Sequence, residues 1–142
     1  RCEAASASVA RLKADLRDTG AKIDELALKM KHVSTYRQLK PIYNRYKASR
    51  DKEKFLRGHE SEIILFEAAA RECKRLGAVP LPATERMQAE IDELNVRKAA
   101  LKAELQKAQR EEQDYAAMRR NVEDFLSTPQ QEQERKKNVE LE

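Results

Sequence analysis

The chain has 142 residues, of which 38% are charged and 40% hydrophobic, with three Gly, four Pro and no Trp. So few Gly and Pro residues argue against a β-sandwich or barrel built on tight turns, and abundant Ala, Glu, Lys, Leu and Arg are typical of long helices and coiled coils. The longest strongly apolar run, Ile63 to Phe66, is far shorter than the roughly 20 residues of a membrane span. We therefore expect one all-α domain over residues 1–128, outside any membrane.

Residues 4–33 carry a seven-residue apolar repeat that predicts the first helix. The repeat advances by alternate steps of three and four residues, which places its members on one stripe, as a coiled-coil seam requires. Its members are Val9, Leu12, Leu16, Thr19, Ile23, Leu26, Met30 and Val33. Pro41 follows, and Lys40 before it is biased away from helical dihedrals, so we expect a turn, kink or restart near residues 38–41.

A second helix is predicted over residues 42–76, with Ser49 as a candidate break. Its apolar stripe again advances by three and four residues. The stripe consists of Leu56, His59, Ile63, Phe66, Ala70 and Cys73. Gly77 is well placed as the C-terminal stop, and Pro80 and Pro82 prevent the helix from continuing.

The third helix is predicted over residues 84–126, where Thr84 is a suitable N-cap. Its repeat keeps an exact step of seven residues. The repeat consists of Met87, Leu94, Leu101, Ala108, Tyr115 and Val122. Residues 129–142 form a polar stretch that we expect to be a disordered tail, with Leu141 and Glu142 as a cloning scar.

Three narrow apolar stripes must be buried against one another, so we expect an elongated antiparallel bundle of about three long helices with coiled-coil character. Two arrangements fit the pattern. One is an up-down-up bundle, and the other is an antiparallel coiled coil of the first and third helices, with residues 36–82 as a helical tip. Because the helices are unequal, we expect one end of the third helix to overhang and to pair with a second copy or with additional sequence.

The net charge of +4 at neutral pH is concentrated in one segment. Residues 31–57 hold nine Lys and Arg against two Asp and Glu, a net charge of +7, whereas residues 1–30 sum to +1 and residues 58–142 to −4. A chain that is nearly neutral outside one basic block suggests that this block binds a polyanion.

The basic block also holds three of the four tyrosines of the chain. Lys and Arg neutralise phosphates and exposed tyrosine rings stack on unpaired bases, so the block is the candidate nucleic-acid site. The candidate residues are Tyr36, Arg37, Lys40, Tyr43, Arg45, Tyr46, Lys47, Arg50, Lys52, Lys54 and Arg57. An alternative stays open, because two of the tyrosines recur with Leu39 and Ile42 at helical spacing. The rings would then belong to the core, with the basic side chains as its solvated face.

No combination of residues predicts a catalytic or metal centre. His59 and Glu60 begin the zinc-protease signature His-Glu-x-x-His, but Ile63 stands where the second histidine belongs. We expect His59 to lie at the edge of the core and to be bonded to a neighbouring carboxylate. The glycines are isolated, so no phosphate-binding loop is present. We predict a non-enzymatic chain without cofactor or metal, with Cys2 and Cys73 as free thiols in a reducing cytosol.

Four stretches resemble the helical region downstream of the nuclease domain in mobilisation relaxases of Gram-positive plasmids and conjugative transposons. They are Tyr36–Tyr46, Arg50–Phe55, His59–Ala69 and Arg120–Leu126, within a resemblance that spans about residues 9–126. The resemblance implies a role in conjugative transfer, in which a relaxase nicks one DNA strand with a tyrosine nucleophile and a histidine-bound metal. This chain has no histidine cluster, so the resemblance is to the non-catalytic part, and we do not expect its tyrosines to act as nucleophiles.

Two functions from different classes stay open. The resemblance implies a non-catalytic helical accessory domain of a relaxase, which contacts DNA of the transfer origin or an acidic partner and self-associates. The alternative is a purely structural coiled-coil scaffold or dimerisation module without nucleic-acid contact. Both place the chain in the bacterial cytoplasm, without a membrane or a small-molecule substrate.

Overall fold

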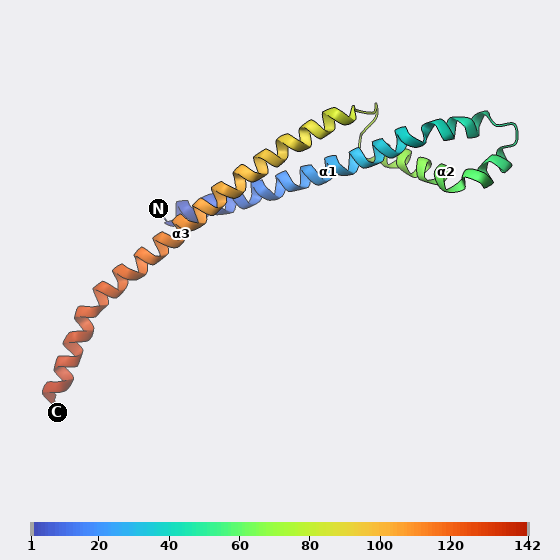
Figure 1. Ribbon diagram of the computed structural model, residues 1–142. Coiled ribbons are helices and arrows are strands. Elements are labelled where there is room, and N and C mark those ends of the chain that lie inside the picture. Colours follow the sequence, from blue (N-terminus) through green and yellow to red (C-terminus); the bar gives the residue numbers. More distant parts are fainter. Residues whose placement is uncertain (1, 142) are drawn as a thin grey trace. The chain divides into compact units, whose positions relative to one another are not determined.

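The computed structural model describes the backbone of residues 2–141 and the side chains of residues 3–127. Its helices are α1 (Cys2–Ala48), α2 (Lys52–Arg75) and α3 (Thr84–Leu141), as Figure 1 shows. Residues 2–141 contain no strand, and the three long helices pack against each other as a helical bundle. The predicted all-α class is therefore confirmed. Within this part of the chain, no helix has both the length and the apolar character needed to cross a bilayer.

Within the described fold, the chain divides into two compact units. Unit 1 combines Arg1–Arg17 with Ala99–Glu142, and unit 2 is Asp18–Lys98. The physical reason is that the apolar side chains gather in two separate clusters, one in each unit. Two of the three helices therefore contribute residues to both units.

In unit 1, the first turns of α1 pack antiparallel on the middle of α3 (Figure 1). The buried members of this cluster are Val9, Leu12, Leu101 and Ala108, with Leu16 and Leu105 packed against them. All of these except Leu105 belong to the predicted repeats, so burial of those stripes holds the two helices together. This pairing is the antiparallel coiled coil of the second predicted arrangement.

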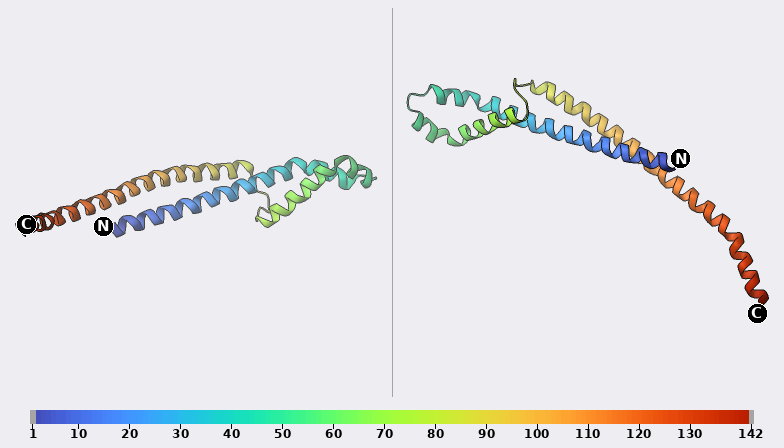
Figure 2. Two further views of the ribbon diagram at one scale, coloured as in Figure 1. Left: turned by 90° about the horizontal axis from the view of Figure 1, so that it is seen from below. Right: turned by 180° about the vertical axis from the view of Figure 1, so that it is seen from behind.

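In unit 2, the chain folds back along α1 through α2 and then enters α3. The buried cluster here consists of Val33 of α1, Cys73 of α2, Ala78 of the following loop and Met87 of α3. Figure 2 shows α2 returning beside the last turns of α1 from two further directions. A helical hairpin of α1 and α2 thus corresponds to the tip that the second arrangement places at residues 36–82.

The loop after α2 begins with the stop that the sequence predicts at Gly77. Gly77 has φ of 71°, its N–H donates to Lys74 O at 3.2 Å, and the N–H of Ala78 donates to Cys73 O at 2.8 Å. These two bonds form a Schellman motif, which satisfies the last carbonyls of the helix. Ala78 is 4% exposed and joins the core of unit 2, so the motif also fixes where the loop begins.

The break that we predicted near residues 38–41 is wrong, because α1 continues through Pro41 to Ala48. Pro41 lacks the N–H that would bond to the carbonyl of Arg37, which costs helix stability. Packing offsets this cost, because Tyr36 before Pro41 and Tyr43 after it both contact the Phe66 ring of α2. Their ring centroids lie 4.7 and 4.3 Å from that of Phe66. Contacts with the ring of Phe66 therefore support α1 both before and after Pro41.

The second helix begins at Lys52, ten residues later than predicted, because the chain turns at Ser49–Asp51 instead. Asp51 is the N-cap, and its carboxylate accepts a bond from the backbone N–H of Lys54 at 3.1 Å. This capping bond satisfies one of the free amides at the start of α2. Within α2, His59 has the non-helical dihedrals φ −136° and ψ 25°, which mark a kink after Gly58.

The predicted end of the third helix near residue 126 is also wrong. α3 runs through Pro129 to Leu141, so the tail expected over residues 129–142 is helical as far as Leu141. The polar residues of this stretch, chiefly Gln, Glu, Arg and Lys, have high intrinsic helix propensity, which a reading based on apolar periodicity does not register. Glu142 lies outside the described residues.

Candidate functional site

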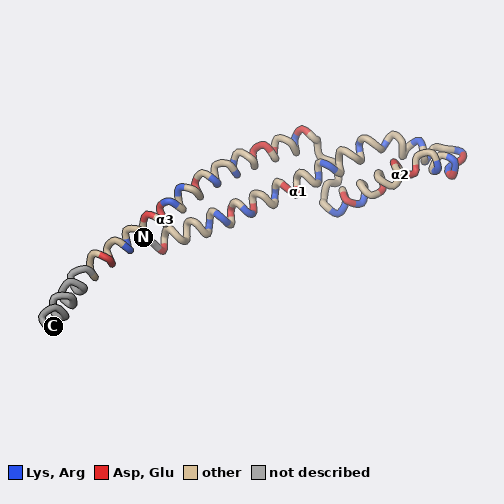
Figure 3. The backbone as a smooth tube through the Cα atoms, turned by 60° about the horizontal axis from the view of Figure 1, so that its bottom comes forward, with Lys and Arg blue, Asp and Glu red and all other residues tan. Residues whose placement is uncertain are grey.

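The basic block lies on the last turns of α1, the Ser49–Asp51 turn and the first turns of α2. The eight Lys and Arg side chains among the candidate residues are all exposed. Among residues 3–127, none of the eight forms an ion pair with a carboxylate. Figure 3 shows Lys and Arg positions gathered along this hairpin. Its positive charge is therefore not neutralised within the described part of the chain.

Arg37 differs from the other cations because its guanidinium is used within unit 2. It donates to Thr84 Oγ1 at 3.0 Å, to Pro82 O at 2.6 Å and to Leu81 O at 3.4 Å. The fork of N–H donors suits this simultaneous contact with the loop and with the start of α3. Arg37 thus ties α1 to the loop, so its first role is structural.

A pocket of 440 Å³ opens between α1 and α2, and we call it the α1–α2 groove. Its lining comprises Tyr36, Lys40, Tyr43, Asn44 and Lys47 of α1, Phe66, Ala70, Cys73 and Lys74 of α2, and Val79 and Leu81 of the loop. The α1 residues recur at helical spacing on one face, which explains why they share the groove. Three lysines line it and no carboxylate does, so the groove suits an anion.

The tyrosine rings of the block pack within unit 2. Tyr43 lies against Phe66 with an interplanar angle of 26°, and Tyr46 lies 6.2 Å from the ring of Phe55. All three tyrosines of the block are half-buried. These contacts favour the alternative in which the rings belong to the core and the basic residues form its outer face.

Two lysines of the groove lie over these rings. Lys47 Nζ is 5.1 Å from the centroid of Tyr43, and Lys40 Nζ is 5.1 Å from the centroid of Tyr36 and donates to its hydroxyl at 3.2 Å. The electron-rich face of a ring attracts a cation at this distance. The ring contacts therefore hold the two ammonium groups at the groove.

The other cations of the block surround the turn. Arg45 lies over Phe55, with Cζ 5.7 Å from the ring centroid, and Arg57 Nε donates to the carbonyl of Glu53 at 3.4 Å. The remaining members, Arg50, Lys52 and Lys54, are exposed beside the capping carboxylate of Asp51. These five cations form a second basic surface, which we call the turn patch and which consists of Arg45, Arg50, Lys52, Lys54 and Arg57.

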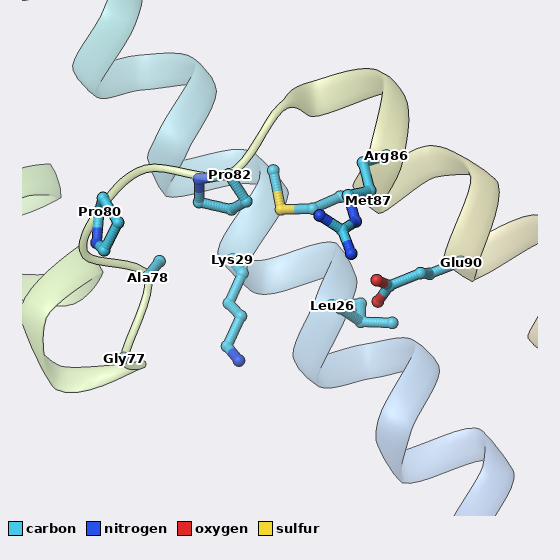
Figure 4. A pocket seen from close by; sticks show the side chains of 9 residues that line it. All are labelled: Leu26, Lys29, Gly77, Ala78, Pro80, Pro82, Arg86, Met87 and Glu90. Atoms are coloured by element: carbon cyan, nitrogen blue, oxygen red, sulfur yellow. The ribbon is translucent and has the colours of Figure 1, made fainter.

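A second pocket in unit 2, of 270 Å³, has a mixed character (Figure 4). It lies between α1, the loop and the start of α3, where Lys29 and Arg86 are accompanied by the carboxylate of Glu90. The ammonium of Lys29 also lies 3.4 Å from Glu25. Its cations thus have acidic neighbours, in contrast to those of the α1–α2 groove.

His59 lies beside a carboxylate, but the predicted bond between them is not formed. Its Nδ1 is 3.5 Å from Glu62 Oε2, without the geometry of a hydrogen bond, and its ring stacks on Phe55 at 4.5 Å. In the part of the chain with described side chains, no three His, Cys, Asp or Glu residues are grouped to hold a metal ion. Burial raises the pKa of the Cys73 thiol, which is 2% exposed at the base of the groove.

Several groove residues were not assigned to the site by the sequence analysis, among them Lys74 and Phe66. Both belong to α2, outside the basic segment of residues 31–57, and only the return of α2 along α1 brings them there. Phe66 was predicted as core, and it is 4% exposed. The signal available for Lys74 was its place next to Cys73 on the apolar stripe, which puts it at the border of the buried face.

Comparisons with known protein families, with curated proteins and with solved structures give no match.

Proposed function

We propose that this chain is a non-catalytic helical module that binds DNA through its phosphates, using the α1–α2 groove and the turn patch. The observation that carries this proposal is the groove itself, where Lys40, Lys47 and Lys74 surround an aromatic floor without a carboxylate. Ammonium groups that no carboxylate neutralises release counterions from a nucleic acid when they bind its phosphates. Arg37 is left out of the binding set because its donors are already engaged.

The contacts of the tyrosine rings determine whether DNA is bound through its bases or through its phosphates. The Tyr43 ring has Phe66 against it at 4.3 Å and the ammonium of Lys47 at 5.1 Å from its centroid. A base could stack on this ring only by displacing the lysine or the phenylalanine. Binding by charge alone is therefore the simpler mode, and it is independent of base sequence and similar for single and double strands.

The resemblance of residues 9–126 to mobilisation relaxases gives this module a biological setting. We propose that it is the accessory helical region of such a relaxase and that it holds DNA of the transfer origin while a separate nuclease domain cleaves it. The two halves of this proposal have different support: the groove supports DNA contact, and the resemblance alone supports conjugation. A gene product in which a nuclease domain with a histidine cluster precedes this region would support the second half, and a different preceding domain would contradict it.

DNA binding is tested by the triple variant Lys40→Glu, Lys47→Glu, Lys74→Glu. The probe is a fluorescent oligonucleotide, as a single strand and as a duplex, and the readout is fluorescence anisotropy at several salt concentrations. We expect the affinity of the wild-type chain to fall steeply between about 50 and 200 mM salt. The triple variant should lose about tenfold or more in affinity at the lower salt, and its salt slope should decrease by about two for the single strand.

The matched control is Lys22→Glu, Lys102→Glu, Lys107→Glu, which changes the net charge equally at exposed positions outside the groove. It should reduce affinity much less than the groove variant. Absence of binding at about 50 mM salt would refute the proposal. So would an equal loss in both variants, because net charge rather than the groove would then govern binding.

The second candidate is a structural scaffold or dimerisation module. It is favoured by a different observation, the exposed apolar side chains of α3, among which Phe125 is 76% and Leu126 is 66% exposed. A scaffold has no need of the groove lysines, so the groove variant would behave like the wild-type chain in every assay of assembly. Self-association without any binding of DNA would select this candidate.

A further inference from the structure

The apolar stripe of α3 continues past the segment that α1 covers. Leu101 and Ala108, which pack on α1, are 7% and 9% exposed, whereas Met118 is 60% and Val122 is 57% exposed. Tyr115, Met118, Val122 and Phe125 follow one another by three, four and three residues, the spacing of a coiled-coil seam. We call these four residues the α3 seam, and its three most exposed members leave a large apolar surface in water.

We propose that the α3 seam binds the same seam of a second copy of this chain, as a parallel two-stranded coiled coil. In heptad terms, Tyr115 and Val122 occupy a positions, and Met118 and Phe125 occupy d positions. Each seam then covers the identical side chains of the other copy, layer by layer. The proposal does not depend on DNA binding, because no residue of the α3 seam belongs to the α1–α2 groove or the turn patch.

The charges beside the seam specify the parallel orientation. With this register, Asp114 occupies a g position and Arg119 the following e position. Both are exposed, and neither is in an ion pair with another described residue. A parallel coiled coil brings each g side chain to the e side chain five residues further along the other helix. Asp114 thus meets Arg119 of the second copy, and by symmetry this favourable pair occurs twice.

An antiparallel arrangement of the same seam lacks this match. Placing Met118 opposite Val122 of the second copy, and Tyr115 opposite Phe125, brings the two Arg119 side chains close together. Like charges at such a position oppose association, and Asp114 gains no cationic partner. A helix of another protein could bury the seam too, but the pairing of Asp114 with Arg119 requires only this chain.

Self-association is tested by sedimentation equilibrium of the full chain over about a hundredfold range of concentration, because a dimer forms by mass action. The wild-type chain should fit a monomer–dimer equilibrium. Val122→Asp should remain monomeric across the range, because a carboxylate would be buried at the seam. The matched control is Val96→Asp, which changes another exposed valine of the same helix outside the seam and should dimerise like the wild-type chain. Val96 is 72% exposed, against 57% for Val122.

The orientation is tested with Arg119→Gln. In the parallel dimer this substitution removes two favourable pairs, so the dissociation constant should rise about threefold. In an antiparallel dimer it would remove a repulsion and tighten association. The double variant Asp114→Arg, Arg119→Asp reverses each pair and should return the dissociation constant to near the wild-type value.

Several results would overturn the proposal. They are a wild-type chain that is monomeric throughout, a stoichiometry other than two, equal loss in Val122→Asp and Val96→Asp, and tighter association of Arg119→Gln. Circular dichroism should show the same helix content for all variants at low concentration, because the substituted side chains are exposed. This control separates loss of association from loss of folding. DNA binding can fail while dimerisation succeeds, so the two proposals are refuted by different measurements.

Discussion

Tyr43 of α1 and Phe66 of α2 stack with their ring centroids 4.3 Å apart and their planes inclined by 26°. The same phenylalanine contacts Tyr36, seven residues earlier on α1, at 4.7 Å. Stacked aromatic pairs add about 0.5–1.5 kcal/mol to the free energy gained from burial. The hairpin that positions the groove lysines therefore depends on one ring of α2 held against two of α1.

We expect Phe66→Ala to lower the free energy of unfolding by about 3–5 kcal/mol, because it leaves a cavity and removes both ring contacts. The neighbouring change Leu65→Ala is the control. Leu65 is 55% exposed whereas Phe66 is 4% exposed, so its truncation should cost about 0.5 kcal/mol or less. Urea denaturation of both variants provides the measurement, and comparable losses would contradict the packing described for α1 and α2.

Pro41→Ala should stabilise the chain by about 2 kcal/mol. The alanine supplies the N–H that the carbonyl of Arg37 lacks, and it avoids the roughly 3 kcal/mol penalty of proline inside a helix. Part of this gain is lost because alanine makes the unfolded chain more flexible. Ser34→Ala, at an exposed position of the same helix, should change stability by no more than about 0.5 kcal/mol. Destabilisation by Pro41→Ala would mean that the helix is interrupted at this position.

Gly77 and Gly20 should respond to alanine in opposite directions. Gly77 has φ of 71°, a conformation that costs a residue with a Cβ about 1–2 kcal/mol. Gly20 lies within α1, and a Cβ there would meet no atom within 4 Å. Thermal or chemical denaturation should show Gly77→Ala less stable and Gly20→Ala more stable, the latter by up to about 1 kcal/mol. The same sign for both would exclude the left-handed stop at Gly77.

Glu72 makes a contribution to stability that depends on pH. Arg75 donates to its carboxylate through Nε at 2.8 Å and Nη2 at 2.6 Å, and this hydrogen bonding lowers the pKa of Glu72 below its ordinary value of 4.5. A carboxyl with a lower pKa in the folded state stabilises the fold above its unfolded pKa. That stabilisation disappears as the pH falls through the folded pKa.

The wild-type chain should therefore be slightly more stable than Glu72→Gln at neutral pH, and the difference should vanish as the pH falls through the lowered pKa of Glu72. The effect is small because the pair is solvent-exposed. Arg75→Gln should show the same convergence, since it removes the other partner. A difference between wild type and Glu72→Gln that grows with acidification would contradict the assigned interaction.

The heptad patterns predicted three helices, and the antiparallel pairing of the first and third was one of the two arrangements that they left open. Val9, Leu12, Leu101 and Ala108 were all placed on seams from their spacing, and these four form the buried cluster of unit 1. Spacing succeeds here because a helix in water must bury its apolar stripe. It failed at Pro41, where a local rule against proline in helices is outweighed by contacts with Phe66, which lies 25 residues further along the chain.

The site was predicted only in part, because some of its residues meet through contacts between distant parts of the chain. The basic segment was visible as a local excess of Lys and Arg, and its cations are exposed. Local composition could not distinguish Arg37, whose guanidinium binds the loop, from Lys47, which faces the groove. Nor could it add Lys74, because that residue joins the groove only when α2 packs on α1.

The sequence by itself determined the helical class, the apolar seams and the location of the positive charge, since each follows from residue types at short, regular spacing. Only the tertiary structure decided that α1 passes through Pro41, that the tyrosines of the block pack on α2 and that three lysines share one groove. These features depend on contacts between residues far apart in the chain, and the energy of such contacts exceeds the local preferences that a sequence pattern expresses.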